Sequence, residues 1–131
     1  MIVLDASAAL ELRLNARLAG KVSSRVFESN QSLHAPHLID IEIAQVLNRL
    51  VRTDTIESTR ADSAFEDLAD LEIPRYPHRM LLPRIWDLRS NTTAYDAAYL
   101  ALAEALGATL LTCDKALGNV PGHHGNVEVL K

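Results

Sequence analysis

The chain has 131 residues, of which 48% are hydrophobic and 23% charged, and its formal net charge at pH 7 is −4. That length suffices for one globular domain and leaves no room for a second, so residues 1–131 are expected to form a single domain. No apolar run reaches membrane-spanning length, and the first residues lack the pattern of a secretory signal, so we expect a cytoplasmic protein without membrane attachment.

Short apolar runs alternate with amphipathic stretches along the chain, which is typical of βαβ units and a parallel sheet. Strands are predicted near Ile2 to Leu4, Leu33 to Ala35, Ile73 to Arg75, Thr109 to Leu111 and Val127 to Val129. Helices are predicted after Pro36 as far as about Arg52, and over Ser58 to Leu71, Leu82 to Leu88 and Ala94 to Leu106, where Gly107 is a suitable C-terminal cap. Right-handed crossovers should place helices on both faces, giving three α/β/α layers.

Asp5 closes the first apolar run, and Ser7 follows two residues later. An acid directly after a buried strand lies in the crevice at the carboxyl edge of a parallel sheet, where ligands bind. Either side chain could instead cap the helix that follows. Because one cap suffices, the pair favours a site in which the other side chain holds a ligand or its water.

Glu42 lies in the helix predicted after Pro36, at the margin of its apolar stripe. The ordinary interpretation of such a glutamate is a surface acid that pairs with Arg49 or another arginine. Asp40 points to a different face of this helix, where an acid in the first turn complements the helix dipole.

Asp96 stands in the first turn of the helix predicted from Ala94 to Leu106. With Thr93 as the N-cap, the sequence resembles a capping box, although Glu or Gln is usual at the acid position. A helix N-terminus also keeps a carboxylate ionised, which suits a metal ligand. Thr92 could assist through its hydroxyl group, and both interpretations of Asp96 stay open.

Asp114 follows the fourth predicted strand in the sequence Thr-Leu-Leu-Thr-Cys-Asp, which repeats the design of the first strand. Thr112 or Asp114 could cap a helical turn that begins at Lys115. Thr112 could equally hold a metal-bound water or a phosphate oxygen. For Asp114, direct ligation of a metal and contact through water are both open.

Brought together by folding, Asp5, Glu42, Asp96 and Asp114 would form a site for a divalent cation. Mg²⁺ and Mn²⁺ prefer oxygen ligands. The five histidines lack zinc-site spacing and are expected in loops, with His34 partly buried. The single Cys113 cannot form an internal disulfide and is interpreted as a small buried residue rather than a nucleophile. Core packing is the expectation for Trp86, Tyr95 and Tyr99.

Four segments of the chain resemble PIN-domain ribonucleases, and most closely the VapC toxins of VapBC toxin–antitoxin pairs. They begin at Val3, Asp40, Thr92 and Leu110 and read Val-Leu-Asp-Ala-Ser-Ala, Asp-Ile-Glu, Thr-Thr-Ala-Tyr-Asp-Ala-Ala-Tyr and Leu-Leu-Thr-Cys-Asp. They stand in the family's order and spacing, and the region after Leu117 matches least.

The resemblance implies a five-stranded parallel sheet in the order 3-2-1-4-5 and an endoribonuclease that uses Mg²⁺ or Mn²⁺. It also implies the roles of the site residues: Asp5, Glu42, Asp96 and Asp114 as catalytic metal ligands, with Ser7 and Thr112 supporting them. Only the resemblance raises Glu42 above the surface-acid interpretation. The implied partners are a VapB-type antitoxin whose tail crosses the active-site groove, an RNA substrate, and a second copy of the chain in a homodimer.

A net charge of −4 is unusual for a nuclease, because phosphate binding rests on Lys and Arg. A metal would neutralise the four acids, and ten of the thirteen basic residues are Arg, which pairs bidentately with phosphate. The RNA could be tRNA, rRNA or mRNA. The sequence selects neither among these nor between one metal ion and two.

Two other classes of protein remain open on the sequence. A non-catalytic PIN-like module would use the acids as helix caps and the fold to hold a partner. A phosphoryl-transfer enzyme of the haloacid-dehalogenase type would use Asp5 as a nucleophile, but it needs a second Asp two residues later, where this chain has Ser7.

Overall fold

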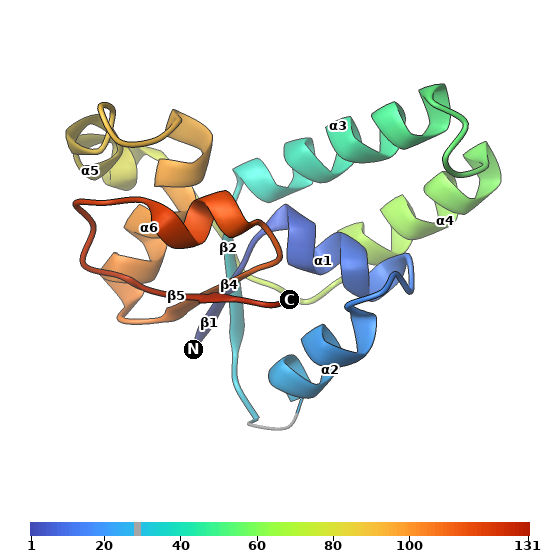
Figure 1. Cartoon of the computed structure of the whole chain (residues 1–131), viewed down its shortest axis with the longest axis horizontal. Coiled ribbons are helices and arrows are strands. Elements are labelled where there is room, and N and C mark those ends of the chain that lie inside the picture. The colour runs from blue at the N-terminus through green and yellow to red at the C-terminus, as the bar shows by residue number, and fades with distance from the viewer. Residues whose placement is uncertain (28–29) are drawn as a thin grey trace.

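The structure is a computed structural model and describes residues 1–27 and 30–131. Helices and strands alternate as the sequence predicts (Figure 1). In chain order they are β1 (Ile2–Leu4), α1 (Ala6–Arg13), α2 (Ala19–Phe27), β2 (Leu33–Pro36), α3 (Leu38–Arg52), α4 (Ser58–Ala69), β3 (Arg75–Tyr76), the 3₁₀ turn η1 (Arg79–Leu81), α5 (Leu82–Asp87), α6 (Ala94–Leu106), β4 (Thr109–Thr112), the 3₁₀ turn η2 (Lys115–Asn119) and β5 (Asn126–Val129).

The five strands form one parallel sheet in the order β3-β2-β1-β4-β5, which confirms the predicted order. The central strand is β1, whose Ile2 is in register with Leu33 of β2 on one side and Thr109 of β4 on the other. The chain leaves β1 toward β2 and later returns to place β4 on the opposite edge of β1. The border between β1 and β4 is therefore the switch point of the sheet.

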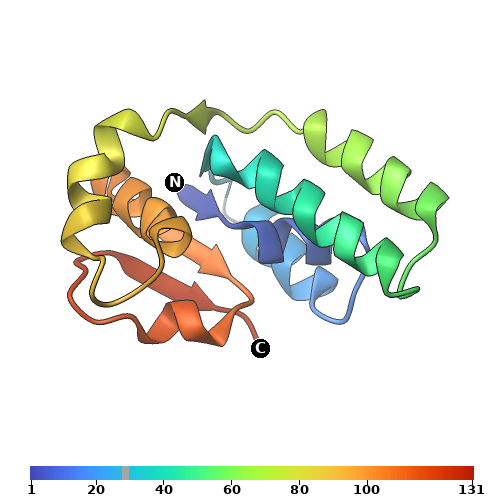
Figure 2. The same cartoon turned by 90° about the horizontal axis from the view of Figure 1, so that it is seen from above.

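Helices cover both faces of the sheet, as predicted (Figures 1 and 2). Because successive strand residues point to opposite faces, β1 contributes to two cores. Ile2 and Leu4 pack with buried residues of α1, α2, α3 and α4, whereas Val3 packs with α5 and α6. None of the helices in residues 1–27 and 30–131 is both long and apolar enough to cross a membrane.

Two elements differ from the prediction by two residues at one end, and the other predicted strands and helices differ by one residue or less. The third strand was predicted at Ile73 to Arg75, but β3 covers Arg75–Tyr76. Pro74 has no N–H to donate to a ladder, and Ile73 is buried in the core beneath α4. The fourth helix ends at Ala69, two residues before the predicted end. Gly107 caps α6 with a left-handed φ of 62°, which confirms its predicted role.

The prediction of core packing is right for Tyr99 and wrong for Trp86 and Tyr95. Tyr99 is 1% exposed, whereas Trp86 is 67% and Tyr95 62% exposed. Ile85 and Leu88 occupy the buried face of the α5 segment, so Trp86 points outward, with the Arg89 guanidinium carbon 4.6 Å from its ring centroid. Tyr95 is exposed because the first turn of α6 extends beyond the core.

Candidate active site

The candidate site lies where β1 and β4 end side by side. Leu4 of β1 is in register with Leu111 of β4, and Asp5 follows directly, its backbone N–H donating to the Leu111 carbonyl over 3.3 Å. Thr112 ends β4, and Asp114 follows two residues later. Parallel strands present their carboxyl ends at the same edge, so both acids stand at the switch point of the sheet.

Asp5 is 5% exposed and is held by three donors from two elements. Its Oδ1 accepts the Ser7 hydroxyl at 2.7 Å and the Ala8 backbone N–H at 3.0 Å, and its Oδ2 accepts the Thr112 hydroxyl in a short hydrogen bond. Asp5 is therefore the N-cap of α1 and a crevice carboxylate at once. A carboxylate oxygen has about two acceptor positions, so Oδ2 keeps one for a further ligand.

Ser7 and Thr112 join the two strand ends behind Asp5. The Ser7 oxygen accepts the Cys113 backbone N–H at 3.0 Å, and the Thr112 oxygen accepts the Asp114 backbone N–H at 3.0 Å. Each hydroxyl oxygen thus accepts a hydrogen bond from a backbone N–H, and each hydroxyl group donates a hydrogen bond to the Asp5 carboxylate. The orientation of this carboxylate is fixed by both β1 and β4.

Glu42 is half-buried on α3, and its partner is a tyrosine. The Tyr99 hydroxyl of α6 donates to Glu42 Oε1 over 2.6 Å. Burial and the contact with Glu42 raise the pKa of Tyr99, so the phenol keeps its proton and remains a donor. No sequence pattern pairs these two residues, although Tyr99 lies in the same segment as Asp96. Asp40 pairs instead with Arg75, with 3.0 Å between Oδ1 and Nη2.

Asp96 is half-buried in the first turn of α6. The Thr93 hydroxyl caps this helix by accepting the Asp96 backbone N–H at 3.2 Å, as the sequence predicts. Burial and the charge of Asp114 raise the pKa of this carboxylate, and the Thr92 side chain lowers it. Thr93 therefore performs the capping, and the Asp96 carboxylate is available for another role.

Asp114 is exposed and caps the short η2 turn, with its Oδ1 accepting the Ala116 backbone N–H at 2.9 Å. The capping alternative is thus observed for this residue. One acceptor position of Oδ1 is used in the cap, and Oδ2 has no hydrogen bond among the residues that the structure describes. Ligation through Oδ2 remains a prediction.

The four carboxylates act on one another electrostatically. Burial is the main cause that raises the pKa of Asp5, Glu42 and Asp96. The charges of Asp5 and Asp96 raise the pKa of Glu42 further, and the charge of Asp114 raises those of Asp5 and Asp96. Like charges act on one another in this way over several ångströms, so folding brings the four distant acids to one region of the molecule. Their ligation of one shared cation remains a prediction.

The donor set suits a hard cation, because it consists of carboxylates supported by hydroxyl groups. Within residues 1–27 and 30–131, no three Asp, Glu, His or Cys side chains already stand in an arrangement that holds a metal. Glu42 is turned to Tyr99, and Asp5 is engaged by Ser7 and Thr112.

The raised pKa values predict how stability depends on pH in the metal-free protein. An acid whose pKa is higher in the folded state stabilises the fold below its unfolded pKa of about 4, and this contribution is lost as pH rises through the folded value. Compared with an Asp5→Asn variant, the wild type should therefore lose stability between about pH 4 and neutrality. Urea unfolding in EDTA across this range measures the difference, and a constant difference would contradict the prediction.

The remaining polar candidates do not join the site. Burial and the charge of Asp5 raise the pKa of the Cys113 thiol to about 11, which agrees with its interpretation as an unreactive residue. His34 lies in β2, within the strand predicted at Leu33 to Ala35 and not in a loop as grouped with the other histidines, and it is buried between Ser32 and the Tyr76 hydroxyl. The strand holds this histidine because both ring nitrogens find partners there.

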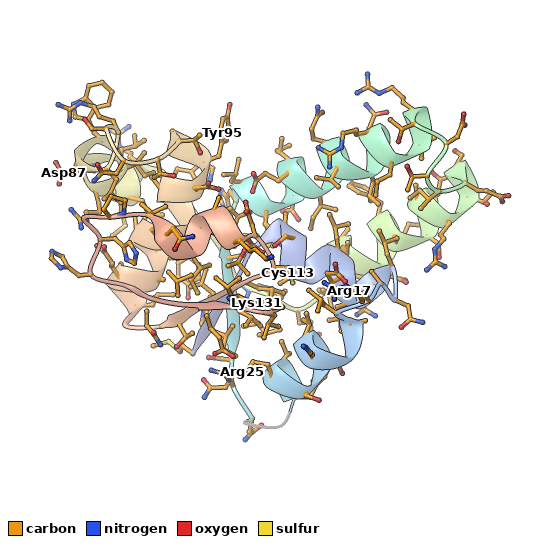
Figure 3. The ribbon with its side chains drawn as sticks, in the orientation of Figure 1. Arg17, Arg25, Asp87, Tyr95, Cys113 and Lys131 are labelled. Atoms are coloured by element: carbon orange, nitrogen blue, oxygen red, sulfur yellow. The ribbon has the colours of Figure 1, made fainter. Side chains whose placement is uncertain are left out.

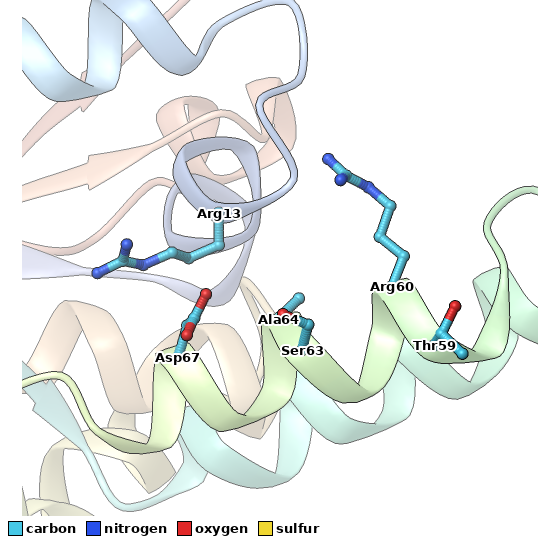
Figure 4. A pocket seen from close by; sticks show the side chains of 6 residues that line it. All are labelled: Arg13, Thr59, Arg60, Ser63, Ala64 and Asp67. Atoms are coloured by element: carbon cyan, nitrogen blue, oxygen red, sulfur yellow. The ribbon is translucent and has the colours of Figure 1, made fainter.

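A separate hollow lies between α1 and α4 (Figure 4). Its wall includes Arg13 of α1 and Arg60, Ser63 and Asp67 of α4. The Arg60 guanidinium is tied to the Leu14 carbonyl at 2.7 Å. None of the four carboxylates lines this hollow, so it is distinct from the candidate active site.

Comparison with known proteins gives consistent matches. The PIN domain family model matches residues 2–122. The VapC ribonuclease Mb0985 of Mycobacterium bovis is 44% identical over 119 residues, which are 91% of this chain and 90% of that protein. Ribonuclease VapC12 of Mycobacterium tuberculosis is 35% identical over 130 residues, 99% of each chain.

Solved structures share the fold at lower identity. VapBC2 from Rickettsia felis, bound to a DNA fragment from its promoter, matches with a TM-score of 0.70 and 15% identity over 100% of both chains. PAE2754 from Pyrobaculum aerophilum matches with a TM-score of 0.66 and 22% identity, over 93% of this chain and 87% of that one. These likenesses concern the fold alone.

Proposed function

The chain belongs to the PIN-domain family, with VapC ribonucleases among its relatives, and we propose from this premise that it is a Mg²⁺- or Mn²⁺-dependent endoribonuclease acting as a toxin. The observation that carries the proposal is the buried Asp5 carboxylate, which Ser7 and Thr112 hold where β1 and β4 end side by side. Burial and the repulsion between like charges also raise the pKa values of Asp5, Glu42 and Asp96. A bound divalent cation removes that repulsion.

In the proposed site, Asp5, Glu42, Asp96 and Asp114 hold the cation, directly or through water. When bound, it would lower the pKa of a water molecule and offset the charge that develops on the phosphodiester. The chain itself supplies orientation. The Ser7 hydroxyl donates to Oδ1 of Asp5 and the Thr112 hydroxyl to Oδ2, which fixes the carboxylate and leaves one acceptor position of Oδ2 for a ligand.

Cleavage of RNA by the purified chain tests the proposal. With Mn²⁺ or Mg²⁺ present, internal cuts should appear in at least one of tRNA, rRNA or mRNA, and EDTA should abolish them. Cleavage that survives EDTA would contradict metal dependence. A chain that cleaves none of these RNAs with either metal would contradict the endoribonuclease assignment.

Tyr99→Phe is expected to lower cleavage by roughly tenfold to a hundredfold, the range found for groups that orient metal ligands. The substitution removes the hydroxyl that holds Glu42 Oε1 and keeps the buried ring. Steady-state kinetics together with thermal unfolding measure the effect. Tyr95→Phe is the matched control, because Tyr95 is exposed on the same helix (Figure 3), and it should change neither quantity.

A VapB-type antitoxin is the proposed inhibitory partner, with its tail across the active-site groove. Support comes from the relatives named VapC and from the fold shared with VapBC2 of Rickettsia felis. Binding of the purified chain to a VapB-type antitoxin, followed by loss of RNA cleavage in the complex, tests this part of the proposal. A complex that retains full cleavage would contradict it.

The proposed homodimer is supported by an exposed apolar face on η1 and α5. Met80 is 86%, Leu82 53% and Trp86 67% exposed. Trp86→Glu should weaken self-association by more than about thirtyfold, since buried interface tryptophans commonly contribute 2 kcal/mol or more. Sedimentation velocity measures the change. Phe27→Glu, at a residue that is 68% exposed on α2, is the control and should leave the assembly unchanged.

A further inference from the structure

The first turn of α3 is capped from a distant part of the chain. His37, the residue before this helix, has helical φ and ψ of −50° and −31° and makes no side-chain cap hydrogen bond. The first backbone N–H groups of a helix have no partner within it. Here the Leu38 N–H donates to Nε2 of His78, which lies 40 residues later, and the distance is 2.9 Å.

His78 also stands between the two helices that carry half-buried acids of the site. It lines a recess together with Leu38 of α3, Ile85 of α5 and Ala94 and Ala98 of α6. Glu42 is on α3 and Asp96 on α6. The imidazole therefore joins the start of one of these helices to the segment packed on the other.

The position of the first turn matters for Glu42. Leu38 and Glu42 are four residues apart and lie on the same side of α3, one turn above the other. Among the residues that the structure describes, Glu42 receives one side-chain hydrogen bond, from Tyr99 of α6. Metal-binding carboxylates must be held to within about 0.5 Å, which requires the turn below the ligand to be fixed as well.

We propose that His78 is a positioning residue of the active site, whose Nε2 accepts the Leu38 N–H and so fixes Glu42 relative to Asp96. This inference rests on the proposed metal-dependent function. An Nε2 that accepts a hydrogen bond places the ring proton on Nδ1. Residue 78 must therefore supply a hydrogen-bond acceptor at the position of Nε2, and the bulk of an aromatic ring alone is not sufficient.

His78→Gln and His78→Asn form the decisive pair. The glutamine amide oxygen can reach the position of Nε2, whereas the asparagine oxygen is one methylene short. Mn²⁺ affinity by calorimetry, kcat and KM for RNA, and exchange of the Leu38 amide by NMR are the readouts. The asparagine variant should lose Leu38 protection, bind Mn²⁺ at least tenfold more weakly and lower kcat more than it changes KM. The glutamine variant should stay within about threefold of wild type.

Two further variants separate this role from packing. His78→Phe keeps a ring without an acceptor and should behave as the asparagine variant does. His37→Phe alters the neighbouring imidazole, whose centroid lies 6.1 Å from that of His78, and should have no effect. Far-UV circular dichroism identifies any variant that does not fold, and the Gln and Asn pair then decides alone.

Each result has one meaning. Equal behaviour of the Gln and Asn variants, or a Phe variant that matches wild type, would overturn the inference. If the Leu38 amide loses its protection from hydrogen exchange while Mn²⁺ affinity stays unchanged, His78 only caps the helix, and the positioning role is overturned. If the wild-type protein binds no Mn²⁺, the proposed metal-dependent function is wrong. His78 then cannot position a metal ligand, and the inference is wrong as well.

Discussion

Replacing Asp5 with asparagine is expected to lower RNA cleavage by on the order of 10³-fold or more, the equivalent of about 4 kcal/mol in the activation barrier. Asn keeps the shape of the side chain and an oxygen that can accept the Ala8 N–H, so the cap of α1 survives. It removes the charge on which cation binding depends. Single-turnover cleavage of RNA at saturating Mn²⁺ measures the loss.

Two comparisons make the Asp5 result specific. Asp96→Asn should have a similarly large effect, because Thr93 caps α6 and the Asp96 carboxylate has no capping duty. Asp40→Asn removes an acid from the same helix as Glu42, but Asp40 is paired with Arg75, so cleavage should be unchanged. Wild-type cleavage by both the Asp5 and the Asp96 variants would contradict the nuclease assignment.

Divalent metal is expected to raise the melting temperature of the wild-type chain by on the order of 10 °C. At a free concentration one hundred times the dissociation constant, a ligand that binds only the folded state contributes about 2.7 kcal/mol. For a chain of this size, about 1 kcal/mol corresponds to several degrees. The physical source is that a bound cation offsets the burial and the like-charge repulsion that raise the pKa values of Glu42 and Asp96. Differential scanning fluorimetry with Mn²⁺, Mg²⁺ or EDTA measures the shift.

The variants respond to metal in an informative way. Asp5→Asn should melt at or above the wild-type temperature in EDTA, because it removes one charge that burial and the Asp114 carboxylate disfavour. It should gain little on addition of Mn²⁺. A non-catalytic module would instead show the same small change in melting temperature with Mn²⁺ in the wild type and the variant. That result would contradict the proposed metal site.

Local patterns predicted the elements of this fold well where one interaction dominates. Gly107 ends α6 because a left-handed residue is needed there, and Thr93 begins it because a hydroxyl can accept the Asp96 N–H. The third strand was displaced because Pro74 cannot donate to the ladder. Trp86 and Tyr95 were assigned to the core from their residue type, but exposure depends on which face of a helix has a neighbour, and a single sequence does not state this.

The amino-acid sequence by itself determined the alternation of strands and helices, the acid after each of two buried strands, and the segments that resemble the PIN family. These are local features, set by periodicity, capping and residue chemistry within a few positions. Only the tertiary structure decided the partners: Thr112 for Asp5, Tyr99 for Glu42 and His78 for Leu38. Such contacts join residues 40 to 107 positions apart, and they depend on the order of the strands and the packing of helices across the sheet.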